Sequence, residues 1–214
     1  MSEILASIST YFQQLPWLEL IAMLLSLAYV ILAAKGSLWC WPAAFISTAL
    51  YTYIFYDVLL LMDSALNAYY LLMAVYGYWQ WSKHTSSTVN KRAELTVVSW
   101  GLSWHVKSCL ALTIVALALG YVMANYTPAD FPYLDTFTTV YAVFATYLVT
   151  QKVLENWLYW IVIDTVSIYL YIEKGLVPTT VLFIIFVIVA CYGYVKWLKL
   201  YKKSAIDLQP ATSS

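Results

Sequence analysis

The sequence predicts an all-α membrane protein with seven transmembrane helices in a single domain. Of its 214 residues, 63% are hydrophobic and 10% are charged, whereas soluble domains carry about 25% charged residues. The apolar residues also fall into long runs of about 20, the length that a helix needs to cross a bilayer. We therefore treat residues 1–214 as one transmembrane domain.

The expected spans follow from these runs and from the polar residues that interrupt them. Lys35 and Gly36 end the first run, Asp57 ends the second, and a polar loop follows the third. Pro42 falls near the start of the second span, where a helix tolerates proline. The expected spans are residues 18–34, 37–56, 58–81, 107–124, 133–151, 154–172 and 176–201.

Basic residues predict the orientation of these spans, because they concentrate on the side that stays cytoplasmic. With seven spans and the N-terminus outside, every Lys and Arg except Lys174 falls on the inner side. The charges therefore favour an N-out, C-in topology.

An internal repeat predicts how the spans are grouped. The pattern Tyr76-Gly77-Tyr78-x-x-Trp81 recurs as Tyr192-Gly193-Tyr194-x-x-Trp197, and Ile46-Ser47-Thr48 matches Ile163-Asp164-Thr165. Two three-helix repeats, 18–81 and 133–201, would then flank a linker helix at 107–124. An odd number of spans separates the copies, so both halves share one orientation, and transporters of this kind bind substrate near the midplane between halves.

Asp164 is the strongest candidate for a binding residue, because it places a carboxylate near the centre of an apolar, aromatic helix. An acid at that depth is costly unless it faces a partner or a wet cavity. Asn156, Trp160, Asp164 and Ser167 follow at helical spacing and share one face. Such a face could bind a small aromatic cation, with Ser47 expected opposite Asp164. Hydrogen bonding that only packs helices together is the alternative.

Other side chains could complete the pocket. Asn67 can both donate and accept hydrogen bonds, although interhelical packing would also explain it. Trp160 and Trp41 offer faces for a cation, whereas an interfacial belt is the expected place of other tryptophans, namely Trp39, Trp81, Trp157 and Trp197. The candidate substrate-binding residues are Asp164, Trp160, Asn156, Asn67, Ser47, Thr48 and Trp41.

Several classes of function are disfavoured. The sequence has no glycine-rich phosphate loop, no plausible Ser/His pair and no His-rich metal motif, so we expect neither an enzyme, nor a cofactor, nor a metal site, and transport should be passive. The zero net charge and the lack of a basic tract argue against nucleic acid as a partner. Cys40, Cys109 and Cys191 are expected to be buried small residues.

The motifs resemble a known family. The segment ENWLYWIVIDTVSIYLYI, which begins at Glu155, the YGYWQW motif that begins at Tyr76, and the three-plus-one-plus-three repeat are similar to the PnuC-type vitamin transporters over residues 18–200. The resemblance implies a SWEET-like helix arrangement in a homotrimer in the bacterial inner membrane. It also implies uptake of an unphosphorylated vitamin by facilitated diffusion, with trapping by a cytoplasmic kinase.

The resemblance also bears on the substrate. Members that carry nicotinamide riboside tend to show Gln at the position of Asn67 and Asn at those of Ala74, Ser47 and Asp164. The pattern ENWxYWxxID is similar to the PnuT branch, which carries thiamine, and a carboxylate suits the thiazolium cation and aminopyrimidine of that vitamin. Thiamine is therefore the expected substrate. Nicotinamide riboside or riboflavin transport, and a sensor or scaffold that does not translocate, are the alternatives.

Overall fold

The computed structural model describes residues 17–57, 61–83, 96–128 and 130–207, and these residues are almost entirely helical. The predicted all-α class is confirmed. The seven helices of the described residues are α2 (Trp17–Ala34), α3 (Cys40–Asp57), α4 (Leu61–Lys83), α5 (Leu102–Tyr126), α6 (Pro132–Thr150), α7 (Asn156–Glu173) and α8 (Val177–Asp207). Within these described residues, three helical stretches are apolar enough to cross a membrane by length and composition alone: α2, α5 and residues Thr179–Ser204 of α8.

The helix ends differ from the expected spans where polar residues do not break a helix. The linker helix begins at Leu102 and ends at Tyr126, so it is longer than the predicted 107–124. Helix α8 continues through its lysines to Asp207, six residues beyond the predicted end. Conversely, α3 begins at Cys40, because Gly36 has a left-handed φ of 70° and starts a turn after α2.

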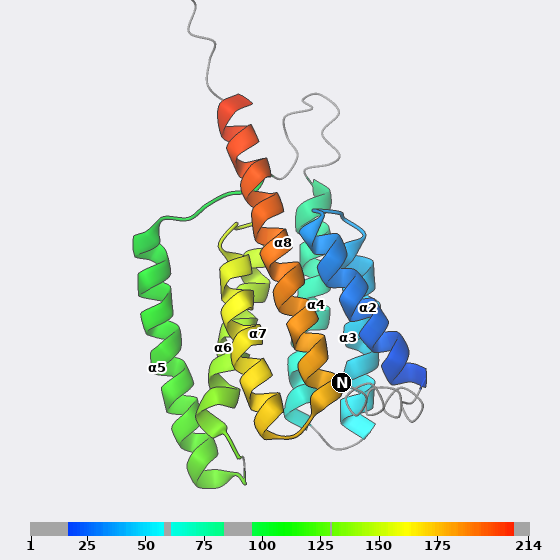
Figure 1. Cartoon of the computed structure of the whole chain (residues 1–214), viewed down its shortest axis with the longest axis vertical. Helices are drawn as coiled ribbons and strands as arrows, with labels where there is room; N and C mark the ends of the chain where they lie inside the picture. Colours follow the sequence, from blue (N-terminus) through cyan, green and yellow to red (C-terminus); the bar gives the residue numbers. More distant parts are fainter. Residues whose placement is uncertain (1–16, 58–60, 84–95, 129, 208–214) are drawn as a thin grey trace, which may run out of the picture.

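The helices form a bundle in which α5 lies at one edge beside α6, and α2 and α3 lie at the other edge (Figure 1). Helix α2 packs against α3 and α8, and α4 packs against α3 and α6. The α2–α3 turn (residues 35–39), the α6–α7 turn (residues 151–155) and the C-terminal end of α8 all lie at the same end of the bundle (Figure 1).

Two helices and two indole donors recur 116 residues apart. Helices α3 and α7 each have 18 residues, and both their first and their last residues are 116 apart. The indole of Trp81 donates to the carbonyl of Thr150 at 3.1 Å, and the indole of Trp197 donates to that of Ala33 at 3.2 Å. The first bond joins α4 to α6, and the second joins α8 to α2.

Four tryptophans form the centre of the core at this end of the bundle. The rings of Trp41 and Trp81 meet edge to face at 5.2 Å between centroids, as do those of Trp157 and Trp197 at 5.4 Å. All four are buried. The expectation that Trp81, Trp157 and Trp197 belong to an interfacial belt is therefore wrong, whereas Trp39 is 74% exposed.

Candidate functional site

The predicted polar face of α7 points into the protein. Asn156, Asp164 and Ser167 are buried, and Trp160 is half-buried against the core. Thr165, the residue after Asp164, is exposed. Spacing along a helix thus identified the interior face correctly.

Asp164 lies in the interior without a polar partner among the residues that the structure describes. Its side chain makes no hydrogen bond or ion pair with any of them, although only 4% of the residue is exposed. The Asp164 carboxyl is close enough to the Tyr70 hydroxyl on α4 to interact with it electrostatically. The Tyr70 hydroxyl is in turn close enough to interact with that of Tyr29 on α2. Polar groups from three helices therefore approach one another in the bundle interior.

Tyr29 and Tyr70 are candidate site residues that the sequence analysis missed. Tyr70 lies three residues after Asn67 and four before the buried Ala74, so these residues share one face of α4. The signal was available in the sequence, because the same stripe continues to Gly77 and Trp81 of the repeated motif. Tyr29 offered no comparable signal.

Ser47 and Thr48 do not supply the expected partners for Asp164. The Ser47 hydroxyl donates to the carbonyl of Ala22 at 2.8 Å and so joins α3 to α2. The Thr48 hydroxyl donates within its own helix, to the carbonyl of Ala44. Counting from the helix starts also changes the pairing: Asp164 is the ninth residue of α7, and the ninth residue of α3 is Thr48, not Ser47.

The two asparagines differ in their surroundings. Asn156 is fully buried, and its amide donates to the carbonyl of Val153 at 2.6 Å, while its side-chain oxygen has no partner in the described part of the chain. Asn67 is half-buried and donates to the carbonyl of Asp63 one turn earlier. Asn156 therefore shapes the start of α7, and Asn67 remains on the interior stripe of α4.

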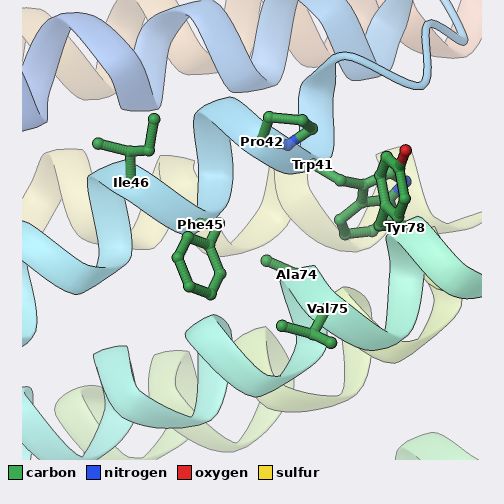
Figure 2. Close-up of a pocket in the computed structure, with 7 residues that line it drawn as sticks. All are labelled: Trp41, Pro42, Phe45, Ile46, Ala74, Val75 and Tyr78. Atoms are coloured by element: carbon green, nitrogen blue, oxygen red, sulfur yellow. The ribbon is translucent and has the colours of Figure 1, made fainter.

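Trp41 lies in an apolar environment, packed in the tryptophan core. Its indole fills the space beside Gly77, where an added Cβ would overlap the ring. It also lines a shallow pocket of about 390 Å³ between α3 and α4. Figure 2 shows that aliphatic and aromatic side chains form this pocket, with no acid among them. The predicted role of Trp41 in binding a cation has no support in this geometry.

Comparison with known proteins identifies the family of this chain. Residues 16–199 match the family model described as nicotinamide mononucleotide transporter. The chain belongs to this family. It is therefore a bacterial multi-pass protein of the inner membrane, and its family is one of membrane transporters and not of enzymes.

Relatives and a solved structure agree with this assignment. The nicotinamide riboside transporter PnuC of Escherichia coli is 25% identical over 86% of this chain and 86% of its own length. The riboflavin/roseoflavin transporter RibM of Streptomyces davaonensis is 24% identical over 92% of this chain and 91% of its own. The crystal structure of the vitamin B3 transporter PnuC shares the fold, with a TM-score of 0.72 and 23% identity over 94% of this chain and 90% of that one.

These relatives overturn the expected substrate. The prediction of thiamine is wrong, because the matched transporters are named for nicotinamide riboside and riboflavin. The prediction relied partly on Ser47 and Ala74 as positions that contact ligand. The structure shows why they misled: the Ser47 hydroxyl is engaged by α2, and Ala74 packs in the tryptophan core.

Proposed function

We propose that this protein carries nicotinamide riboside into the cell by facilitated diffusion across the inner membrane. Its membership of the nicotinamide mononucleotide transporter family and its full-length similarity to PnuC support this function. As the family resemblance implies, a cytoplasmic kinase would trap the vitamin by phosphorylation, and the protein would act as a homotrimer.

Asp164 is the observation in the structure that best supports a cationic substrate. Nicotinamide riboside carries a positively charged pyridinium ring, a carboxamide and ribose hydroxyls. A buried carboxylate without a protein partner is costly in a membrane, and a cationic ligand would offset that cost. Trp160, one turn away, offers a ring face for the pyridinium. The phenol groups of Tyr29 and Tyr70 can bond the ribose or the carboxamide.

We infer that two halves, α2–α4 and α6–α8, are related by an axis along the membrane normal and are joined by α5. The helix ends that recur 116 residues apart and the two indole bonds, which join α4 to α6 and α8 to α2, support this arrangement. All seven helices would cross the membrane. The N-terminus would lie outside, and the end of the bundle that carries the α2–α3 and α6–α7 turns would face the cytoplasm. Transport folds of this kind bind substrate near the midplane between their halves, which suits the depth of Asp164.

A binding titration of the purified protein, paired with counterflow of labelled vitamin in liposomes, tests the proposal. Asp164→Ala should raise the Kd for nicotinamide riboside about 10- to 100-fold, because a bond to a charged group is lost. Thr165→Val is the matched control, since Thr165 is exposed and its hydroxyl bonds its own helix. Wild-type protein that neither binds nor exchanges the riboside would refute the function. Unchanged affinity in Asp164→Ala would remove the role of Asp164.

Riboflavin is the second candidate, because RibM matches this chain over 92% of its length. The isoalloxazine ring of riboflavin is uncharged, so a buried carboxylate favours the riboside over it. Counterflow with each vitamin in the same liposomes distinguishes the two substrates. Asp164→Ala should reduce exchange of the riboside far more than any exchange of the flavin.

A further inference from the structure

The segment that leads into α5, residues 96–101, is fastened to the turn before α7. The amide of Val98 donates to the carbonyl of Lys152 at 3.1 Å, and the amide of Leu154 donates to the carbonyl of Val98 at 2.7 Å. These bonds form a parallel β-bridge between Val98 and Val153. Val97 and Val153 are both buried. The lead-in segment and the α6–α7 turn therefore form one packed unit.

The carboxylate of Glu155, the residue immediately before α7, contacts three polar groups of the lead-in segment and α5. One carboxylate oxygen accepts from the Ser99 hydroxyl at 2.5 Å, and the other accepts from the backbone amide of Trp100 at 3.4 Å. The Nε2 atom of His105 lies 3.6 Å from the second oxygen. The Glu155 side chain is only 19% exposed, so water screens these interactions less than at the surface.

His105 extends the contact by one helical turn. Its Nδ1 atom lies 3.0 Å from the hydroxyl of Tyr159, and that hydroxyl lies 3.4 Å from the sulfur of Cys109. Glu155 and Tyr159 are four residues apart, so they lie on the same side of α7, one turn above the other. Two fixed points on one side of a helix restrict both its rotation and its sliding.

This restriction matters for the proposed binding site. Asn156 and Trp160 each follow one of the fixed residues by one position, and Asp164 comes one turn later. A successive residue in an α-helix is rotated by about 100°, so the contacts at Glu155 and Tyr159 set the direction of the interior face.

We propose that Glu155 is a positioning residue, which clamps the lead-in segment of α5 to α7 and thereby orients Trp160 and Asp164 toward the substrate. The proposal rests on the proposed function. It assigns a role to the first residue of the ENWLYW motif without any contact between Glu155 and the vitamin. The clamp is static: it holds throughout transport.

The test combines loss of the clamp with its covalent replacement, in protein that carries Cys191→Ser to remove the exposed cysteine. Glu155→Ala should weaken the Kd for nicotinamide riboside in the folded, monodisperse fraction about tenfold, the change expected when one bond to a charged group is lost. Glu173→Ala, at the exposed far end of the same helix, should leave the Kd unchanged. A purely structural role would lower the yield of folded protein without changing its affinity.

A disulfide should then replace the clamp. Bridged backbone segments lie about 4.8 Å apart, within the Cα separation of about 4.4–6.8 Å that a disulfide spans. Val98→Cys with Val153→Cys, once oxidised, should restore the affinity of Glu155→Ala protein, and a reductant should abolish the rescue. In protein that retains Glu155, the oxidised disulfide should leave counterflow unchanged.

Three results would overturn the proposal: wild-type affinity in Glu155→Ala, no rescue by the oxidised disulfide, or a disulfide that blocks counterflow although Glu155 is present. Hydrogen exchange supplies a readout that needs no substrate. Backbone amides in the first turns of α7 should exchange faster in Glu155→Ala and slow again on oxidation. If the wild type binds no riboside, the proposed function fails, and unchanged exchange in Glu155→Ala would separately refute the clamp.

Discussion

The α2–α3 turn and the α6–α7 turn have the same backbone but different surroundings. In each, the second residue donates to the carbonyl three residues earlier and the third donates to the carbonyl five residues earlier, as Gly36 does to Ala33, Ser37 to Leu32, Lys152 to Val149 and Val153 to Leu148. Only the α6–α7 turn pairs with the lead-in segment of α5. In the described residues, the backbone hydrogen bonds of the α2–α3 turn stay within α2, the turn and α3.

This difference shows that the backbone conformation of a turn does not determine which other segments the turn contacts. The left-handed second position is glycine in one turn, with φ of 70°, and lysine in the other, with φ of 50°. A lysine bears a steric cost there that glycine avoids. The Lys152 ammonium lies 4.4 Å from the centre of the Trp81 ring, and this cation–π contact offsets part of that cost.

The largest effects should come from adding a side chain at the two glycines that pack against an indole ring, Gly77 and Gly193. A Cβ at Gly77 would overlap the ring of Trp41, and one at Gly193 would come within 2.7 Å of the ring of Trp157. Gly77→Ala and Gly193→Ala should each lower stability by about 1–3 kcal/mol, the usual cost of overpacking a core. Thermal unfolding in detergent measures this loss.

Gly101→Ala is the control for these two substitutions, because nothing lies within 4 Å of its added Cβ and its φ of −61° suits alanine. It should unfold at the wild-type temperature. Tolerance of alanine at one of these two glycines but not at the other would show that the two glycine–indole contacts are packed differently.

Removing an indole donor should have the next largest effect. Trp81→Phe and Trp197→Phe each leave a helix-terminal carbonyl without its indole partner, that of Thr150 or that of Ala33. Each should cost about 1–2 kcal/mol in unfolding experiments. Trp39→Phe, at an exposed position, is the control. Unequal losses for Trp81 and Trp197 would indicate that one interface between the halves is the stronger.

The two left-handed positions should respond differently to a change of residue. Gly36→Ala should destabilise the protein by about 1 kcal/mol, because alanine is strained at a φ of 70°. Lys152→Gly should change stability little, since relief of the same strain is balanced by loss of the cation–π contact with Trp81. Equal destabilisation by both substitutions, measured as shifts in unfolding temperature, would contradict this account.

The helices and the interior face of α7 could be predicted from the sequence, because apolar runs and helical spacing are local signals. The lead-in segment could not, since its bridge to the α6–α7 turn joins Val98 to Val153 across 55 residues without a hydrophobic period. The pairing of Asp164 with Ser47 stays a prediction, although the Ser47 hydroxyl bonds to α2. Similarity of short segments paired Asp164 with Ser47, whereas a constant shift of 116 residues, set by Trp41 and Trp157, pairs it with Thr48.

Ser47 provides the smallest predicted effect and a direct check of that pairing. Ser47→Ala removes one interhelical hydrogen bond to Ala22, and such bonds in membrane proteins average about 0.6 kcal/mol. Stability should fall by about that amount, while the Kd for nicotinamide riboside should not change, because the hydroxyl faces α2. Thr48→Val, which removes a bond within one helix, should change stability even less. If Ser47→Ala instead weakened binding as much as Asp164→Ala does, Ser47 would face the ligand, and the pairing of Asp164 with Ser47 would be supported.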